Sequence, residues 1–233
     1  MFRSILTVLF TFVIFFAAPV GAQTSQRVHG GDTFIADATI SHTFAADRDV
    51  FAVGKVVTAR GTARGDMHLV GFDVDQMTTV GGNLLAVGTA VTMGAPVAGD
   101  VMATGMTVRS TRNGTVGGNV VLFGNTVTVD GAVSGSMTAF GQTVVLNASV
   151  DGDVWLAAKD ISFGPDAIIA GRLILVAEDQ ISVPERVVSP DRVTYEKMQP
   201  SRIATRMKEG WKNVEYPMLP TFVSLFSAFL VSL

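Results

Sequence analysis

Apolar and polar residues alternate along short stretches of this chain, and the same alternation returns at a fixed spacing. In the segment "VSGSMTAFGQTVVLNASVDGDVWLAAKD", residues 133–160, a glycine followed by a small polar residue occurs at Gly135-Ser136 and again at Gly152-Asp153. The apolar runs between these pairs are short and rich in β-branched residues, which favours strands over helices. The pattern therefore predicts a repeated unit of β-strands.

The repeat extends in both directions from this segment, and we number the positions of each unit from the first residue of its pair. Equivalent pairs follow at steps of 17 residues, with two steps of 19, and they are Gly31-Asp32, Arg48-Asp49, Gly65-Asp66, Gly82-Asn83, Gly99-Asp100, Gly118-Asn119, Gly135-Ser136, Gly152-Asp153 and Gly171-Arg172. The longer steps contain the turn sequences "RNG" at 112–114 and "GPD" at 164–166, so we expect corner loops to absorb their extra residues.

Positions three, five and ten of the unit are apolar in nearly every copy. Position ten is the most uniform and reads Ile40, Val57, Val74, Val91, Val108, Val127, Val144 and Ile161. A unit of this length holds three short strands and no helix, and stacked units would bury such columns in one continuous core. We therefore expect Val127 and Val144 to be fully buried and stacked on one another in adjacent coils.

These observations predict an all-β fold, a single-stranded β-solenoid of about eight to nine 17-residue coils spanning residues 31–189. The repeated glycines are expected where the chain turns a corner or adopts a positive φ. The Asp or Asn beside the first glycine can bond nearby backbone, so stacked copies should form a polar ladder. A short amphipathic helix and a hydrophobic tail are expected to follow the solenoid.

The outward positions of the first strand are apolar, although they should point away from the core. Positions four and six include the residues that we select as the candidate self-association or partner face: Phe51, Val53, Leu85, Val87, Val121, Phe123, Phe140 and Trp155. Positions nine and eleven of the second strand carry mainly threonine and charge instead. An apolar strip on a soluble rod predicts that another copy, a partner or the C-terminal helix covers it.

Both ends of the chain suggest export and membrane attachment. Residues 1–22 combine Arg3, an apolar run and a small-residue exit, which predicts a signal peptide, with an uncleaved anchor as the alternative. Residues 23–30 are then a linker. The segment 217–233 is apolar, and we expect a transmembrane helix cut off by the end of the sequence, or else a tail that packs on the domain.

Between the solenoid and this tail, residues 190–216 form a basic linker that contains a candidate amphipathic helix, "SRIATRMKEGWKNV". Its candidate membrane-proximal residues are Arg202, Arg206, Lys208, Trp211 and Lys212. Residues 186–212 carry seven Lys or Arg against three Asp or Glu, while residues 27–185 carry nine against sixteen. A negative rod on a positive stem is expected to stand away from an anionic membrane.

Candidate catalytic and metal-ligating residues are few. The chain has no cysteine, which excludes disulfides, zinc thiolates and thiol nucleophiles, and of its three histidines only His68 lies well inside the repeats. A calcium ladder on the repeated acids would need the "GGxGxDxUx" pattern, which is absent. Asp73 and Asp75 are more typical of a solvated face than of a lyase site. We expect no enzyme activity, no cofactor, no metal and no nucleic-acid partner.

Three segments carry a family resemblance: "GDVMATGMTV", "GGNVVLFGNTVTVDGAV" and "VDGDVWLAAKDISF" resemble the G-D-V-x-A-x-G-x-x-V units of bactofilin-like, polymer-forming cytoskeletal proteins. The resemblance covers about residues 31–189. It implies a right-handed β-helix that assembles end to end or side by side, with no catalytic residues to carry over. The signal peptide and hydrophobic C-terminus depart from soluble bactofilins, and the chain is more similar to exported, membrane-anchored relatives.

The sequence therefore predicts an exported, periplasmic or extracytoplasmic protein that is tethered to a membrane by its C-terminal segment. The first hypothesis is a structural scaffold of the cell envelope that self-associates through its solenoid. The second is a binding module that recognises an envelope protein or a polysaccharide through the apolar face. The third is a β-helix enzyme, an acyltransferase or a polysaccharide lyase, although acyltransferase hexapeptide repeats give 18-residue coils and the dominant step here is 17.

Overall fold

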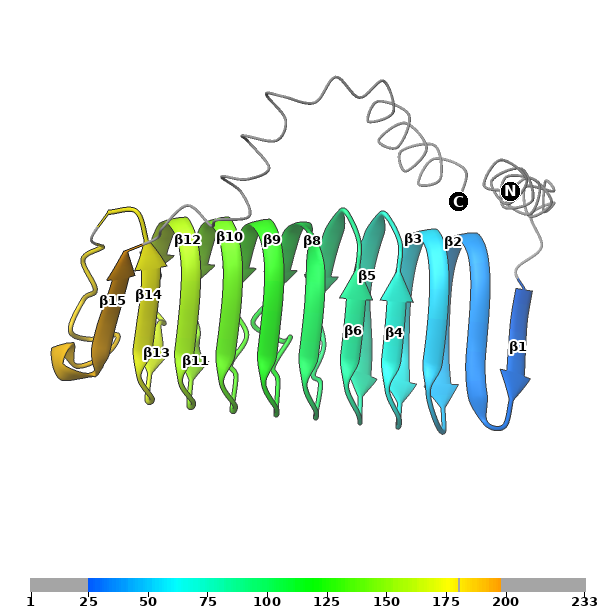
Figure 1. The fold of residues 1–233 in the computed structure, drawn as a ribbon. Helices are drawn as coiled ribbons and strands as arrows, with labels where there is room; N and C mark the ends of the chain where they lie inside the picture. The colour runs from blue at the N-terminus through cyan, green and yellow to red at the C-terminus, as the bar shows by residue number, and fades with distance from the viewer. Residues whose placement is uncertain (1–24, 180, 198–233) are drawn as a thin grey trace, which may run out of the picture. The chain divides into compact units, whose positions relative to one another are not determined.

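The computed structural model describes residues 25–179 and 181–197, which lie in one compact unit of β-strands (Figure 1). In this part of the chain the single helix is a short 3-10 turn, Pro190–Arg192, and no helix is long and apolar enough to cross a bilayer. The expected signal peptide, the candidate helix within 201–214 and the hydrophobic segment 217–233 lie outside the described residues.

The described residues form fifteen strands. They are β1 (Ser25–His29), β2 (Asp32–Ala46), β3 (Val50–Ala63), β4 (Met67–Val70), β5 (Asp73–Val80), β6 (Leu84–Val87), β7 (Ala90–Met93), β8 (Val101–Ser110), β9 (Val120–Val129), β10 (Met137–Leu146), β11 (Ser149–Val150), β12 (Val154–Phe163), β13 (Ile168–Ile169), β14 (Leu173–Ala177) and β15 (Val193–Lys197).

Successive coils pair in parallel and in the register of the repeat, which confirms the predicted all-β solenoid. Position three of one coil pairs with position three of the next, as Thr33 does with Val50 and Val50 with Met67. The solenoid has about ten coils, compared with the eight to nine expected, and we number them from coil 1 at Gly31 to coil 10 at Asp191. Figure 1 shows the coils stacked side by side.

Coils 1 to 8 each have three faces, as expected for three extended segments. Face one contains positions three to six, face two contains positions nine to twelve, and face three is centred on position sixteen. In several coils faces one and two belong to one bent strand, for example β8 and β9. Face three is reduced to single parallel bridges in the middle coils, where Val80, Val97, Val116, Val133 and Val150 pair in turn.

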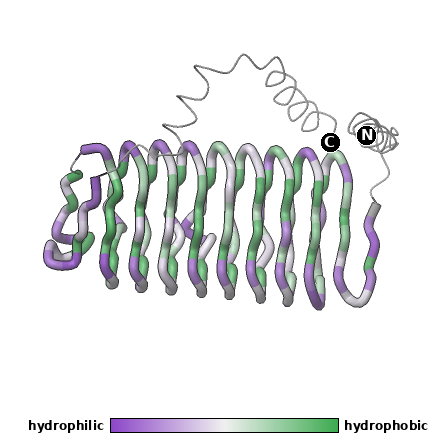
Figure 2. The backbone as a smooth tube through the Cα atoms, in the orientation of Figure 1, coloured by the Kyte–Doolittle hydropathy of each residue, from purple (hydrophilic) through white to green (hydrophobic). Residues whose placement is uncertain are grey.

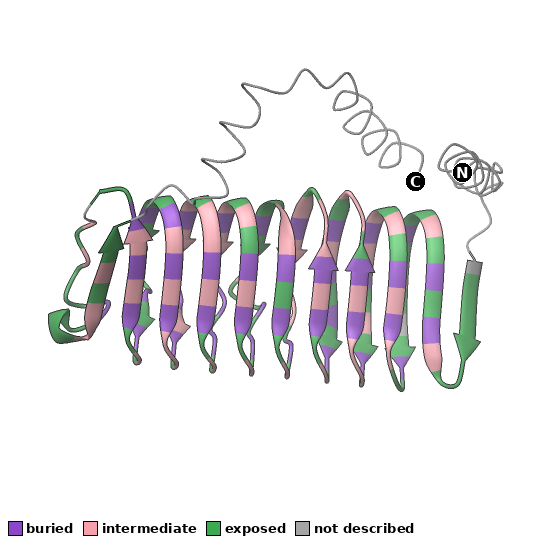
Figure 3. Cartoon of the chain, in the orientation of Figure 1, coloured by how far each residue is buried: buried purple, intermediate pink, exposed green. Residues whose placement is uncertain are grey.

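The core consists of the columns predicted from the repeat, together with the position-sixteen valines, which the sequence analysis did not single out. Val127 and Val144 are both 0% exposed and pair with one another, which confirms their predicted burial and stacking. Hydrophobic residues recur at equivalent places in successive coils (Figure 2), and buried residues alternate with less buried ones along the strands (Figure 3). Alternation along a pleated strand accounts for this arrangement.

The repeated glycines lie mostly at corners, the first of the two alternatives expected, and close backbone approach requires them there. Within the described residues, positive φ occurs only at Gly30, Gly31 and Gly61. At position seven, a Cβ built on Gly105 would lie 2.7 Å from the carbonyl oxygen of Gly88 in the preceding coil. Since real Cβ atoms essentially never come so close, the stacking distance between coils selects glycine at this corner.

Both ends of the solenoid differ from the sequence expectation. Residues 25–29, expected to be linker, form β1, which pairs antiparallel with Asp32–Ala36 of β2. The β-sheet also continues past residue 189, because β15 pairs in parallel with β14. Coil 9 reaches this pairing after a step of 20 residues through an irregular segment, whose Val187 and Val188 are buried in the core. A longer step without a glycine pair concealed the tenth coil in the sequence.

Candidate interaction surface

The eight residues that we selected from the sequence lie on face one, and the structure places none of them in the core. Val53 and Phe123 are 41% and 40% exposed, and the other six are of intermediate exposure. They come from β3, β6, β9, β10 and β12, which are adjacent or nearly adjacent strands of one sheet. The fold therefore brings the eight residues to a single side of the solenoid.

The surface is larger than the eight selected residues, because equivalent positions in the other coils are also apolar. Phe34 in coil 1, Val70 in coil 3 and Met102 in coil 5 are all exposed, and Ile174 in coil 9 is of intermediate exposure. Reading positions four and six in every coil would have identified these four residues from the sequence. We call the outward side chains at positions four and six of coils 1 to 9 the apolar strip; it is apolar apart from His68, Thr104 and Thr138.

Aromatic rings stack on one another along the apolar strip. The ring centroids of Phe34 and Phe51 are 4.9 Å apart with planes inclined by 6°, and those of Phe51 and His68 are 4.5 Å apart and inclined by 8°. A second stack joins Phe123 to Phe140, with centroids 4.8 Å apart and planes inclined by 1°. The coil spacing of a parallel sheet sets this distance. In both stacks the ring faces contact each other, so their edges point outward.

Trp155 extends the second stack in a different geometry. Its ring lies 4.7 Å from that of Phe140, with the planes inclined by 85°. The two residues occupy different positions of their coils, since Trp155 pairs with Thr138 in the sheet and Phe140 pairs with Ala157. An edge-to-face contact is one of the favoured arrangements for aromatic pairs. Trp155 is thus the last aromatic residue of the strip, and its ring is nearly perpendicular to that of Phe140.

A polar ladder runs along one rim of face one, as predicted for the Asp and Asn residues at position two. In each rung the backbone N–H of one coil donates to the side-chain oxygen of the preceding coil: Asp66 to Asp49 (2.8 Å), Asn83 to Asp66 (2.7 Å), Asp100 to Asn83 (2.8 Å), Asn119 to Asp100 (2.6 Å) and Ser136 to Asn119 (3.0 Å). The repeated acids therefore serve as acceptors for the backbone of the next coil.

The described residues show no rung between coils 7 and 8, and the ladder resumes with an ion pair at coils 8 and 9. Arg172 donates from Nη2 to Asp153 Oδ2 at 2.7 Å, and its backbone N–H donates to Oδ1 at 2.8 Å. These hydrogen bonds lower the pKa of the Asp153 carboxyl below its usual value. They raise the pKa of the Arg172 guanidinium, so both groups are charged at neutral pH.

A second polar ladder, which the sequence analysis missed, lies at the corner after face two. Ser110 Oγ accepts from the backbone N–H groups of Asp130 and Gly131, and Asp130 accepts from the Asn147 side chain at 3.0 Å. Asn147 in turn accepts from the Asp166 backbone at 3.0 Å. The two-residue insertions shift these residues out of the 17-residue register, which concealed the ladder. The insertions themselves lie at corners, as expected.

Face two is polar on its outer side. Thr107, Arg109 and Asp160 are exposed there, and the pair Asp73 and Asp75 has Ala90 and Thr92 as its neighbours in the next coil. Among the described residues, no group of three or more His, Cys, Asp or Glu is arranged to hold a metal ion. Faces one and two thus differ in chemistry although they share the same coils.

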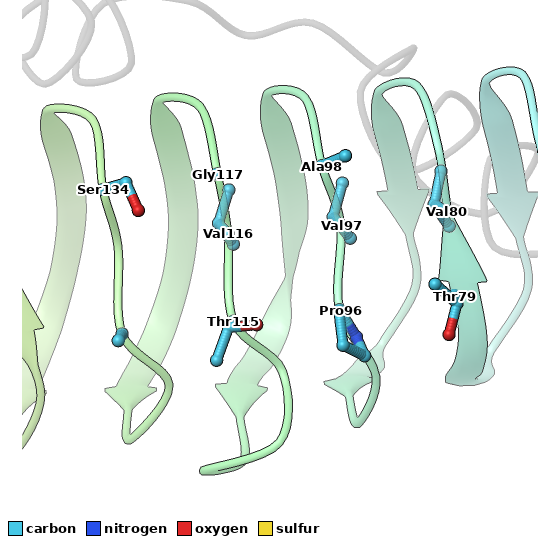
Figure 4. Close-up of a pocket in the computed structure, with 10 residues that line it drawn as sticks. Thr79, Val80, Pro96, Val97, Ala98, Thr115, Val116, Gly117 and Ser134 are labelled. Carbon is cyan, nitrogen blue, oxygen red and sulfur yellow. The ribbon is translucent and has the colours of Figure 1, made fainter.

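Face three carries an open groove of about 300 Å³ across four coils. Figure 4 shows small uncharged side chains along it, including Thr79, Pro96, Thr115 and Ser134. The backbone of the groove is paired between coils; for example, Val97 N–H donates to the Thr115 carbonyl at 2.9 Å. The groove therefore offers small side chains and no charged group.

The five candidate membrane-proximal residues, Arg202, Arg206, Lys208, Trp211 and Lys212, lie outside the described residues. The structure therefore places the apolar strip but says nothing of these residues. A scan against protein-family models found no match to this chain, and comparisons with curated proteins and with solved structures found none either.

Proposed function

We propose that this protein is a non-enzymatic, exported scaffold of the cell envelope, tethered to a membrane and self-associating through its solenoid. The observation that carries the proposal is the apolar strip, which runs along face one through nine consecutive coils. Its outward side chains are not needed to fill the core, because positions three and five already do so on the same strands. A second molecule that covered the strip would give these side chains a role.

The energetic argument for a cover is the number of large side chains involved. Fully burying a Leu, Phe or Val side chain is worth roughly 1.5–3 kcal/mol relative to leaving it in water. The strip contributes four phenylalanines that are stacked but not buried, and Phe34 and Phe123 are both about two-fifths exposed. Contiguous apolar patches of this extent on soluble proteins mark interaction sites.

The sequence supports the location and the architecture of the proposed scaffold. The apolar N-terminal segment with Arg3 supports export, and the apolar segment 217–233 supports membrane attachment. The resemblance to bactofilin-like proteins supports assembly and a right-handed coil. We extend the proposal to all ten coils, since β15 continues the sheet into the basic segment that precedes the candidate anchor.

The ring geometry also bears on the alternative of a polysaccharide-binding module. A sugar ring stacks on an exposed aromatic face, whereas the two stacks in the strip place ring faces against one another. The Trp155 ring is nearly perpendicular to the Phe140 ring, unlike the stacked phenylalanine rings, which present their edges to the outside. The edge-on arrangement favours contact with another protein surface over contact with a polysaccharide chain.

The proposal is tested by the mass of the full-length chain, purified in a mild non-ionic detergent, over a wide concentration range. Light scattering should show concentration-dependent association, and electron microscopy should show assemblies that contain more than one rod. A chain that stays monomeric at every concentration but captures an envelope protein or polysaccharide would favour the binding module.

A further inference from the structure

The apolar strip pairs a large with a smaller side chain within each coil. Positions four and six read Phe34/Ala36, Phe51/Val53, His68/Val70, Leu85/Val87, Met102/Thr104, Val121/Phe123, Thr138/Phe140, Trp155/Ala157 and Ile174/Val176 from coil 1 to coil 9. The larger residue changes from position four to position six in coils 6 and 7, and the smaller one changes with it. Within each coil, therefore, the larger side chain at one of these positions stands beside a smaller one at the other.

Face one has two rims, position two on one side and position eight on the other, and their charges are complementary within each coil that carries both. Three coils carry a charge at position eight, and each carries the opposite charge at position two: Asp49 with Lys55, Asp153 with Lys159, and Arg172 with Glu178. The two rims are separated by six residues of extended chain, about 20 Å, so a charge at position eight cannot pair with the charge at position two of its own coil. Asp153 and Arg172, both at position two, pair with each other along the rim. In the described part of the chain, Lys55, Lys159 and Glu178 form no ion pair.

We propose that the partner of the apolar strip is a second copy of this chain, packed face to face with its coils parallel and in register. The inference rests on the self-association proposed above and specifies its geometry. A two-fold axis along the coil stack places position four of each coil opposite position six of the same coil in the other copy. It also places position two opposite position eight.

This arrangement satisfies both patterns at once. Every large side chain of the strip meets the smaller one of its own coil, so the two surfaces interdigitate. Lys55 meets Asp49 of the other copy, Lys159 meets Asp153, and Glu178 meets Arg172. Across coils 1 to 9 no position-two residue meets a position-eight residue of like charge. Complementary charges of this kind fix the register of an interface.

A reversed copy fits less well. Reversal brings position four opposite position four and position two opposite position two. The reversed alignment that best matches the rim charges pairs coil 2 with coil 9, and it then brings His68 against Trp155 and Asp66 against Asp153. At coils 2 and 9 the same alignment brings Asp49 to Arg172 and Lys55 to Glu178, so its charges match there and conflict at coils 3 and 8. The parallel pairing has no such conflict in any coil and is therefore favoured.

The size of face one is adequate for such a pair. Four residues at about 3.3 Å and nine coils at about 4.8 Å give roughly 550 Å² per copy, or about 1,100 Å² for the pair. A specific interface needs about 1,000 Å² in total. The side chains that project from the sheet and the residues of the two rims add to this flat area.

Crosslinking at the two ends of the strip tests the geometry, because the chain has no native cysteine. Val53→Cys lies in coil 2 and Val176→Cys in coil 9, both at position six. Facing sheets about 10 Å apart with a two-residue offset place each residue about 12 Å from its counterpart in a parallel pair. In a reversed pair each residue is opposite the other end of the strip, more than about 30 Å away.

The expected result is that each single-cysteine chain, full length in mild detergent, is captured as a dimer by a bis-maleimide that spans this distance. Thr107→Cys, exposed on face two, is the matched control and should not be captured. Rim charges are tested by the triple variant Lys55→Glu, Lys159→Glu and Glu178→Lys, which should weaken association by on the order of tenfold or more. Arg60→Glu, off face one, changes the net charge equally and should leave association unchanged.

The outcomes separate this inference from the proposed function. Association without capture at either cysteine, or association that the triple variant does not weaken, overturns the parallel pairing and leaves the scaffold proposal standing. A chain that is monomeric by light scattering at every concentration overturns both. Capture of both cysteines together with the charge effect supports the parallel pair.

Discussion

Faces one and two of the solenoid belong to the same coils and often to the same bent strand, yet their outer surfaces differ. Both faces bury their inward residues equally, since Leu122 on face one and Val127 on face two are each 0% exposed. Outside, face one presents stacked aromatic rings and face two presents threonine and charge. The fold therefore requires apolar residues only at the inward positions. The apolar residues on the outer side of face one must have another cause.

The largest expected effect separates inward from outward positions on face two. Val127→Asp buries an unpaired carboxylate in a column of valines, and we expect a loss of roughly 3–5 kcal/mol in the free energy of unfolding. Thr128→Asp, the next residue and outward facing, should change it by no more than about 0.5 kcal/mol. Urea unfolding followed by circular dichroism measures both. Similar losses for the two variants would mean that the alternation is misplaced.

The second prediction separates the outer sides of the two faces. Phe123→Ser combined with Trp155→Ser should leave the β-sheet circular dichroism intact and raise the dissociation constant of self-association about a hundredfold or more, since each large side chain contributes roughly 1.5–3 kcal/mol. The matched control on face two, Thr107→Ser combined with Thr126→Ser, should leave it unchanged. A loss of the β-sheet signal in the first variant would show that these side chains support the fold.

A smaller effect is expected at the corner between the two faces. Gly105→Ala places a Cβ 2.7 Å from the Gly88 carbonyl oxygen, so adjacent coils must move apart, at a cost of about 1–3 kcal/mol. Gly94→Ala is the control, because its nearest heavy atom lies at 3.3 Å and an adjustment of a few tenths of an ångström suffices. Thermal unfolding compares the two. Equal melting temperatures would show that the corner tolerates a side chain.

The smallest effect is a gain at the rim of face one. Ser136 accepts no ladder hydrogen bond from coil 8 in the described part of the chain, whereas Asn119 accepts one from Ser136. Ser136→Asn supplies the longer side chain and should stabilise the protein by about 0.5–1 kcal/mol. Ser134→Asn, exposed on face three, should be neutral. A destabilised Ser136→Asn chain would show that the rung cannot form there.

The inward columns could be predicted from the sequence because a strict step of 17 residues keeps position ten, from Ile40 to Ile161, in one register. The valine column of face three lies two residues before successive glycine pairs and has the same steps, so it was present in the sequence pattern although it was not singled out. The ladder from Ser110 to Asp166 crosses corners with insertions, so its spacing varies and the sequence did not show it. The glycines were recognisable as corner residues, but the contact between Gly105 and the Gly88 carbonyl depends on the distance between coils. Local sequence does not encode that distance.

The candidate surface could be predicted in kind, and its extent could also be read from positions four and six of every coil. Phe51 and Trp155 were recognisable because alternation along a strand fixes which side chains point outward. The stacking of His68 on Phe51 was not predictable, because it depends on ring orientations in adjacent coils. The tenth coil was also missed, since Asp191-Arg192 has no glycine and follows a longer step.

The central claim, that face one is covered when the chain associates, is tested most directly by the reactivity of single cysteines. Val53→Cys on face one and Thr58→Cys on face two lie on the same strand, β3. The rate of maleimide labelling is measured for each full-length chain from dilute to concentrated solution. The account predicts that labelling of Val53→Cys slows as the chain associates while labelling of Thr58→Cys does not. Equal rates at all concentrations, in a chain that light scattering shows to be associated, would contradict it.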